Sequence, residues 1–396
     1  MEINVQSVYD QARDYIDMHQ KEMLARLKEW VSMESPTEDI GAVNRLVAAL
    51  EEEMKKDLSV RVISFASAGS TLIAERSGTD ALAPVVFIGH CDTVHPVGSL
   101  VGDMPLRLDA DGKAYGPGIL DMKGGIVISL YAIRALTAAG YLKRPLRLLI
   151  SGDEESGHQG SQSFGLIQEQ CRGAAAAFVF ETGYQDNRII IQRKGTGHFT
   201  MESFGKAAHA GICPQDGRHA ILDMAKRVEL IQALNDNNRG ITYNVGRISG
   251  GTVVNAVPDY CKIDIDVRYV VSDDIPQITT NLQKIANSNY VDGVSAVLGG
   301  GIQFLPMEAT EKNKALFSIV RDAAVQLGYP TPYEASTGGG SDAANASAAG
   351  VPTVCSMGVQ GGGPHTKEEF AVVESLFDRC KLLVRSVLLA EERSFL

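Results

Sequence analysis

The sequence predicts an α/β protein with a mostly parallel sheet covered by helices on both faces, into which an α+β domain of ferredoxin-like order is inserted. Short apolar runs alternate with segments of helical periodicity along most of the chain, which is typical of parallel strands joined by helices. After about residue 192 the rhythm changes, and strand-like and helix-like segments follow in the order β-α-β-β-α-β. A chain of 396 residues is long enough for two such domains.

Each element is predicted from the spacing of its apolar side chains. The first domain, at residues 1–191 and 306–396, is expected to have helices at 8–32, 40–53, 124–139 and 313–328 and strands at 60–65, 85–88, 146–151 and 177–181. The insert, at residues 192–305, is expected to have strands at 193–204, 241–250, 259–270 and 294–299 and helices at 217–235 and 273–289.

Composition limits the class of partner and the compartment. A formal net charge of −11 argues against nucleic acid or an anionic membrane as the main partner, and no apolar run is long enough to span a bilayer. The six cysteines form no Cys-x-x-Cys pair, and the first residues lack the basic and apolar regions of a signal peptide. We therefore expect reduced thiols and a cytoplasmic location.

Five residues with metal-binding side chains follow predicted strands or lie in glycine-rich loops: His90, Asp121, Glu155, Glu181 and His365. Ligands bind beyond the carboxyl ends of strands in parallel sheets, so we expect these side chains to meet. Two imidazoles and three carboxylates are what two adjacent Zn²⁺ ions need if one carboxylate bridges them. Glu154 has no ligand duty in that count and is free to act as a general base. The pattern predicts a two-metal hydrolase.

His90, Asp92 and Asp121 also have simpler possible roles. His90 has Asp92 two positions on, which can accept a hydrogen bond from the ring nitrogen that does not bind metal. Alternatively, the two form a solvated surface pair. Asp121 precedes the helix expected at 124–139, so it can bridge two metals or cap that helix.

The later acids and histidine also have alternatives. Glu154 and Glu155 are adjacent acids that form a solvated turn unless a cation lies nearby. Glu181 ends a run of apolar or small residues and needs a partner, either a metal or a salt bridge to Arg188 or Lys194. His365, in a glycine-rich loop, is otherwise a surface residue. The remaining histidines that lie in no comparable context receive no role: His19, His95, His158, His198 and His219.

Several motifs occur together in one order along residues 85–370. They are Gly89-His-Cys-Asp-Thr-Val, Tyr115-Gly-Pro-Gly-Ile-Leu-Asp-Met-Lys-Gly-Gly, Ser151-Gly-Asp-Glu-Glu-Ser-Gly, Phe180-Glu, Gly205-Lys-Ala-Ala-His-Ala-Gly, Gly250-Gly-Thr-Val-Val-Asn-Ala-Val-Pro, Asp266-Val-Arg and Thr337-Gly-Gly-Gly-Ser-Asp-Ala. With these motifs the chain resembles the co-catalytic zinc peptidase family that includes carboxypeptidase G, succinyl-diaminopimelate desuccinylase, acetylornithine deacetylase, tripeptidase T and the aminoacylases.

The resemblance implies two Zn²⁺ ions per subunit, with Co²⁺ or Mn²⁺ as alternatives. The implied ligands are His90, Asp121 and Glu181 for one ion, and Asp121, Glu155 and His365 for the other. Glu154 would be the general acid and base, and Asp92 would orient His90. The insert would be a lid through which two subunits form a homodimer.

The resemblance also implies residues that hold the substrate. His209 would stabilise the oxyanion across the dimer, and Asn255 and Arg268 would grip the substrate, with Arg268 on its carboxylate. Arg188 and Gly339 lie where carboxypeptidase G-like relatives contact substrate. Taken without the resemblance, His209 could cap a turn, Asn255 could be a turn residue, and Arg268 could pair with an aspartate of its strand.

The expected reaction is hydrolysis of an amide beside a free carboxylate, in a small peptide or N-acyl amino acid. The closest likeness is to carboxypeptidase G, but glycine occupies the position, within 299–301, where glutamate-specific relatives have an arginine. A dipeptidase, desuccinylase, deacetylase or aminoacylase activity is the alternative. A third hypothesis is a non-catalytic metal-binding relative, for which a damaged ligand set would be expected.

Overall fold

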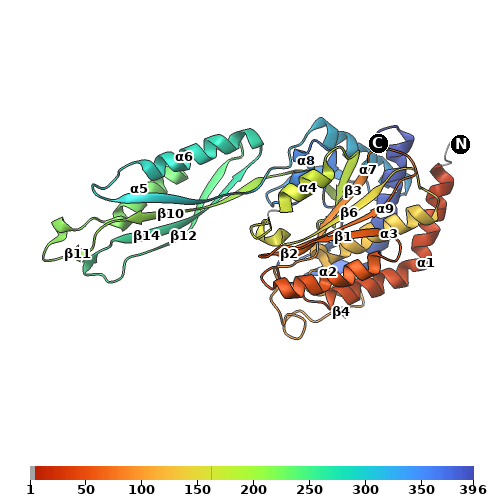
Figure 1. The fold of residues 1–396 in the computed structure, drawn as a ribbon, viewed down its shortest axis with the longest axis horizontal. Coiled ribbons are helices and arrows are strands. Elements are labelled where there is room, and N and C mark those ends of the chain that lie inside the picture. Colours follow the sequence, from red (N-terminus) through yellow and green to blue (C-terminus); the bar gives the residue numbers. More distant parts are fainter. Residues whose placement is uncertain (1–4, 162) are drawn as a thin grey trace. The chain divides into compact units, whose positions relative to one another are not determined.

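The computed structural model describes residues 5–161 and 163–396 (Figure 1). The chain forms two compact units. The first consists of Met1–Gln192, Ala309–Ser336 and Ser341–Leu396, and the second of Arg193–Glu308 and Thr337–Gly340. The short segment Thr337–Gly340 groups with the second unit although the chain on both sides of it belongs to the first, and no periodicity in the sequence indicates this return.

The first unit is built on a six-stranded sheet of order β1-β2-β6-β3-β7-β17. Its strands are β1 (Ser59–Ile63), β2 (Gly69–Arg76), β3 (Val85–His90), β6 (Leu146–Gly152), β7 (Ala176–Val179) and β17 (Thr353–Val354). Only β2 runs against its neighbours, and β6, β3, β7 and β17 are parallel. The predicted mostly parallel sheet is confirmed, and β2 is a strand that the sequence analysis did not identify.

Helices cover both faces of this sheet (Figure 1). Alternate side chains of β6, such as Leu146 and Leu148, join one large buried cluster with five helices: α1 (Val5–Val31), α2 (Ile40–Met54), α3 (Gly124–Ala138), α7 (Glu311–Gln326) and α9 (Val373–Glu392). The other face is covered by α4 (Ser163–Cys171) and α8 (Ala343–Ala348), which contact each other, and α8 also contacts β7 and β17. Most of α9 is buried, and this helix is not among the elements predicted from the sequence.

Even so, no helix in the described parts of the chain is both long enough and apolar enough to cross a bilayer.

A second, smaller sheet in the first unit holds the loop that carries His365. Its order is β4 (Arg107–Leu108), β5 (Lys113–Tyr115), β19 (Phe370–Val372), β18 (Gln360–Gly362) and β8 (Gly183–Tyr184). Because β18 and β19 are antiparallel neighbours, residues 363–369 form the turn between them. Strand β18 also pairs with β8, which follows Glu181 in the chain. These pairings bring the His365 turn towards the end of β7.

The second unit is a four-stranded antiparallel sheet with two helices packed against it. The strands, in the order β12-β14-β10-β15, are Thr242–Gly250, Tyr260–Tyr269, Gly195–Phe204 and Ser295–Phe304, and the helices are α5 (Ala220–Gln232) and α6 (Ile275–Asn287). Apolar side chains from the sheet and from both helices form a separate core. The predicted β-α-β-β-α-β order of a ferredoxin-like unit is present.

Candidate metal centre

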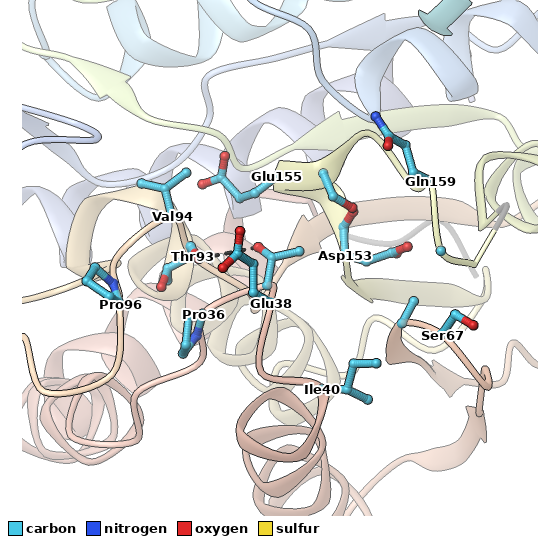
Figure 2. Close-up of a pocket in the computed structure, with 14 residues that line it drawn as sticks. Pro36, Glu38, Ile40, Ser67, Thr93, Val94, Pro96, Asp153, Glu155 and Gln159 are labelled. Carbon is cyan, nitrogen blue, oxygen red and sulfur yellow. Dashed lines mark hydrogen bonds between the residues drawn. The ribbon is translucent and has the colours of Figure 1, made fainter. Parts of the chain in front are cut away.

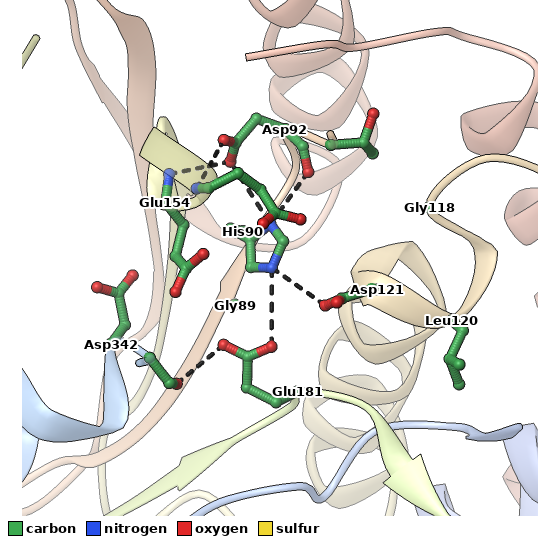
Figure 3. Close-up of polar contacts among 12 residues, drawn as sticks. Gly89, His90, Asp92, Gly118, Leu120, Asp121, Glu154, Glu181 and Asp342 are labelled. Carbon is green, nitrogen blue, oxygen red and sulfur yellow. Dashed lines mark hydrogen bonds and ion pairs between the residues drawn. The ribbon is translucent and has the colours of Figure 1, made fainter. Parts of the chain in front are cut away.

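Three neighbouring parallel strands bring four polar side chains to one edge of the main sheet. His90 ends β3, Glu154 and Glu155 follow β6, and Glu181 follows β7. Since β6, β3 and β7 are adjacent and parallel, their carboxyl ends lie side by side. Figure 3 shows His90 facing Glu181 on one side and Asp121 on another, with Glu154 beside them.

Asp121 lies between the two candidate histidines. Its Oδ1 is 3.4 Å from Nε2 of His90, and its Oδ2 is 3.3 Å from Nε2 of His365. Nε2 of His365 is also 3.3 Å from Oε2 of Glu155, and Nε2 of His90 is 3.7 Å from Oε2 of Glu181. Asp121 belongs to the turn Ile119–Lys123 and caps no helix, because α3 has no side-chain cap.

The arrangement fits a pair of divalent cations. Good N–H···O hydrogen bonds measure about 2.7–3.2 Å, whereas two ligand atoms of one tetrahedral zinc lie about 3.4 Å apart. Oδ1 of Asp121 and Oε1 of Glu155 are buried and accept no hydrogen bond from the described chain. Two overlapping groups have ligand atoms within 4.8 Å of one another: His90, Asp121 and Glu155, and His90, Glu154 and Glu181. Distance alone therefore does not separate Glu154 from the other acids.

The electrostatics favour positive charge at this place. Asp121 and Glu155 raise the pKa of His365 to about 10. Burial opposes the charging of His90, yet the surrounding carboxylates hold its pKa well above the ordinary value. Burial likewise opposes ionisation of Asp121, but the two histidines outweigh it and lower the pKa of this carboxyl group. In the metal-free protein, protons on the imidazoles thus balance part of the negative charge.

Glu154 is buried beside like charges. Burial and the neighbouring carboxylate of Glu181 raise its pKa well above the ordinary value. Its backbone N–H and that of Glu155 donate to Oδ1 and Oδ2 of Asp92, each at 3.1 Å. The Nδ1 atom of His90 lies 3.0 Å from the main-chain oxygen of Asp92 and 3.5 Å from its Oδ1. The nearer acceptor for His90 is therefore the carbonyl, whereas the carboxylate fixes the turn that carries both glutamates.

Glu369, which the sequence analysis did not single out, joins three of the loops that meet here. Its carboxylate is fully buried and accepts hydrogen bonds from the backbone N–H groups of Leu120 (2.8 Å), Asp121 (3.1 Å) and Gly118 (3.2 Å). Its Oε2 is also 2.6 Å from Nε2 of His95. His95, to which the sequence analysis gave no role, follows His90, and Glu369 follows His365. The only sequence signal is that both lie four or five residues from a candidate ligand.

His158, also given no role from the sequence, joins the loop after β6 to the loop before α8. It is buried between Asp153 and Asp342, with Nδ1 3.0 Å from the first and Nε2 2.6 Å from the second. Next to Asp342, the hydroxyl of Ser341 donates to Oε1 of Glu181 at 2.8 Å. Glu181 thus pairs with a hydroxyl and His90, rather than with Arg188 or Lys194 as the alternative interpretation proposed.

Arg188 forms its ion pair with Asp186 rather than with a candidate metal ligand. Its Nε lies 2.9 Å from both carboxylate oxygens of Asp186, and its guanidinium stacks on the ring of Tyr184. Tyr333 donates to the same aspartate. A substrate carboxylate would have to compete with Asp186 for this arginine.

In the second unit, His209 and Asn255 are neighbours. Strand β11 (Ala208–His209) pairs with β13 (Ala256–Val257), and the N–H of Ala210 donates to the carbonyl of Asn255 at 2.9 Å. Nδ1 of His209 accepts from the N–H groups of Gly211 and Ile212 at 3.1 and 3.2 Å, which is the turn cap considered from sequence. Because Nδ1 is an acceptor, the ring hydrogen resides on Nε2, which stays available as a donor.

Arg268 and Gly339 also belong to the second unit. Nε and Nη2 of Arg268 each donate to Asp266 at 2.8 Å, as the in-strand pairing predicted, and Nη1 donates to the carbonyl of Gly338 at 3.3 Å. The carbonyl of Gly339 accepts from Arg193 at 3.3 Å.

A cavity of about 490 Å³ borders the candidate metal residues through Glu155. Figure 2 shows the carboxylates of Glu38, Asp153 and Glu155 among the side chains around it. Among the described residues, no lysine, arginine or histidine lines it. Oδ2 of Asp153 is buried without a hydrogen-bond partner in the described chain.

Comparisons with known proteins agree on one family. The sequence profile of peptidase family M20/M25/M40 matches residues 86–389. Carboxypeptidase G2 of Pseudomonas sp. is 29% identical over 384 residues, covering 93% of this chain and 89% of its own. Succinyl-diaminopimelate desuccinylase of Corynebacterium glutamicum is 22% identical over 321 residues, covering 78% and 82%. The crystal structure of aminopeptidase PepT from Bacillus cereus superposes with a TM-score of 0.77 at 23% identity, covering 94% of this chain and 99% of that one.

Proposed function

Because the chain belongs to peptidase family M20/M25/M40 and is a metal-dependent hydrolase, we propose that it is a two-zinc enzyme that cleaves an amide bond beside a free carboxylate. Its substrate would be a small peptide or an N-acyl amino acid, as the name carboxypeptidase of a relative suggests. The observation that carries the proposal is the position of Asp121, whose two oxygens face Nε2 of His90 and Nε2 of His365 at 3.4 and 3.3 Å.

The proposed ligands would divide between two ions that share Asp121. One ion would be held by His90, Asp121 and Glu181, and the other by Asp121, Glu155 and His365. Zn²⁺ suits this mixture of imidazole and carboxylate, and Co²⁺ or Mn²⁺ would substitute. When bound, such ions supply Lewis-acid chemistry, which polarises the scissile carbonyl and acidifies water.

Glu154 would move the proton. Its buried carboxylate lies beside His90 and Glu181, and burial raises its pKa, so it holds a proton more readily than an exposed glutamate does. It would take a proton from the attacking water and deliver it to the leaving nitrogen. Asp92 would hold the turn on which Glu154 is placed, by accepting the two backbone N–H groups of that turn.

The second unit would bind and orient the substrate. Nε2 of His209 is the donor that an oxyanion needs, and Asn255 lies next to it. Within the described chain, Nη1 of Arg268 is bonded only to a carbonyl at 3.3 Å, so it can shift to a substrate carboxylate, with Gly339 close by in the chain. Arg188 would be a weaker contact because Asp186 occupies its guanidinium.

The cavity beside Glu155 favours a second candidate activity, that of a dipeptidase. Besides the proposed ligand Glu155, the carboxylates of Glu38 and Asp153 line it, and no cationic side chain among the described residues does, which suits a substrate with a free α-ammonium group. An N-acyl amino acid has no such group, and a dipeptide does.

A homodimer in the cytoplasm completes the proposal. In the second unit, Ile212, Val253 and Val254 have large exposed side chains, which a partner subunit would cover. Cys91, Cys171, Cys213, Cys261 and Cys380 are free thiols in the described chain, as expected in a reducing compartment. Light scattering should give twice the chain mass, and Val254→Asp should shift it towards the monomer.

A substrate panel tests the function. The zinc-loaded protein is offered N-acyl amino acids, dipeptides, and the same compounds with the carboxylate amidated. We expect hydrolysis of at least one class and a loss of about 100-fold or more in kcat/KM on amidation, because an arginine–carboxylate pair is lost. Equal rates for free and amidated substrates, or no hydrolysis by zinc-loaded protein, would contradict the proposal.

A further inference from the structure

A second cavity lies in the first unit and is lined by none of the proposed metal ligands. It has a volume of about 330 Å³ and is bounded by α7, α9, the segment that follows α7, and the turn between β8 and β9 (Arg188–Arg193). Its polar lining consists of Gln185, Asn187, Tyr329, Gln360, Asp378 and Arg379. Neither the family match nor the proposed reaction gives these residues a task.

Arg379 is the unusual member of this lining. Its side chain is 4% exposed, and no described residue forms a hydrogen bond or an ion pair with its guanidinium. Its Nη2 is buried without a partner. Burial lowers the pKa of Arg379 to about 10, so the group is still charged at neutral pH. A buried charge without a partner is costly, which indicates that something else neutralises it in the working protein.

Asp378, the next residue, supplies the opposite charge without satisfying Arg379. Its Oδ1 accepts a hydrogen bond from the hydroxyl of Tyr329 at 2.9 Å, and it makes no ion pair with Arg379 in the described chain. The cavity therefore offers a cation and an anion that are not bonded to each other.

The amide side chains add acceptors near these charges. Nε2 of Gln360 donates to the carbonyl of Tyr184 and to Oδ1 of Asn187, both at 2.8 Å. Nε2 of Gln185 donates to the carbonyl of Gly361 at 3.1 Å. With their nitrogens used in this way, Gln360 and Gln185 each keep an amide oxygen for a donor from a ligand.

We propose that this cavity binds a free α-amino acid as its zwitterion. The α-carboxylate would lie on the guanidinium of Arg379, where two parallel hydrogen bonds can form, and the α-ammonium would lie on Asp378 and the amide oxygens. A volume of about 330 Å³ is at the small end of ligand pockets, so it suits one amino acid better than a peptide. If the proposed hydrolysis also holds, the ligand is chemically the product of the reaction.

Calorimetric titration of the intact zinc-loaded protein tests the proposal. The probes are glycine, L-alanine, L-serine and L-glutamate, with propionate as the matched compound that lacks the ammonium group. We expect at least one amino acid to bind, and propionate to bind at least about ten-fold more weakly, because one charged contact is missing. Absence of binding by all four amino acids at millimolar concentrations, or equal binding of propionate, overturns the proposal.

Two variants separate this cavity from the metal centre. Arg379→Met keeps an unbranched apolar stem, which is shorter than arginine, and removes the charge, so it should weaken amino-acid binding at least about ten-fold and leave hydrolysis in the absence of amino acid unchanged. Asp378→Asn keeps an acceptor for the hydroxyl of Tyr329. It should weaken the binding of L-alanine but not the binding of propionate. If Arg379→Met does not fold, Asp378→Asn alone decides. Unchanged L-alanine binding in a folded variant places the ligand elsewhere and overturns the proposal.

Discussion

At the scale of single residues, the centre is an excess of carboxylates around two imidazoles. Burial raises the pKa of Glu154 and of Glu155, whereas the histidines lower the pKa of Asp121. The pKa values of carboxyl groups are therefore shifted in opposite directions within one site. The acid held ionised between the histidines is suited to bridge cations, and the acid that gains a proton most easily is suited to transfer one.

Glu154→Gln tests the proton transfer. The amide keeps the size of the side chain but cannot take a proton, so kcat should fall about 10²- to 10⁴-fold. Zinc content should remain that of the wild type, and Glu52→Gln, an exposed acid on α2, is the matched control. Elemental analysis with steady-state kinetics checks both, and full activity with intact metal would remove Glu154 from the mechanism.

Zinc binding should release protons. In the metal-free protein the pKa of His365 is raised from 6.5 to about 10, so its proton stabilises the fold fully below pH 6.5 and this contribution is lost as pH rises through about 10. Zinc needs the neutral ring, so zinc affinity should rise with pH over the same window. Calorimetric titration with zinc at pH 8, in buffers of different ionisation enthalpy, should show proton release. The number of protons released per chain should be lower by about one in His365→Ala. Identical heats in all buffers would contradict this expectation.

At the scale of elements, buried side chains that bond to more than one loop hold the loops of the site in place. Glu369 binds the turn before α3 and contacts His95, so three loops that carry His90, Asp121 and His365 share one carboxylate. His158 does the same for the loops after β6 and before α8. We expect these partners to act as positioning residues, because they contact the loops that carry the proposed ligands rather than the ligating atoms.

Glu369→Gln tests whether Glu369 positions the turn that carries Asp121. One amide nitrogen would now face backbone N–H groups, so the Asp121 turn should lose part of its fixed geometry and zinc affinity should fall about 10- to 100-fold. Excess zinc should restore kcat, which a general loss of structure would not allow. Glu374→Gln, at the exposed start of α9, is the control. Wild-type zinc affinity in the Glu369 variant would contradict the positioning role.

At the scale of the whole molecule, the two units have separate cores, and the residues proposed for metal binding and for substrate binding divide between them. The proposed ligands all belong to the first unit, in segments from β3 to the turn before β19, whereas His209, Asn255, Arg268 and Gly339 belong to the second. A metal pair would crosslink distant segments of the first unit only, and it would stabilise that unit by binding the folded state.

Zinc removal should therefore destabilise the first unit more than the second. Hydrogen exchange with mass spectrometry should show faster exchange in residues 118–123 and 363–369 after chelation, because the metal no longer holds these turns. Exchange in the core strands β10 and β14 should change little. Equal acceleration in both units would contradict the assignment of the metals to the first unit alone.

Although the sequence by itself did not indicate strand β2, helix α9 or the second sheet of the first unit, it determined the parallel sheet, the order of elements in the ferredoxin-like insert and the family. These follow from local periodicity and from motifs such as Gly89-His-Cys-Asp, which are readable because each lies within a few residues. Local patterns also selected the five residues proposed as ligands, because parallel strands end at a common edge.

Only the tertiary structure decided which side chains support them. His95 and Glu369 are 274 positions apart and each is unremarkable in its local sequence, so no spacing connects them. The same holds for His158 and Asp342. Nor does any local pattern indicate that Thr337–Gly340 returns to the second unit, or that Nη2 of Arg379 is buried without a partner in the described chain. Burial and hydrogen bonding depend on what the rest of the chain places around a residue, and that information is not contained in a short stretch of sequence.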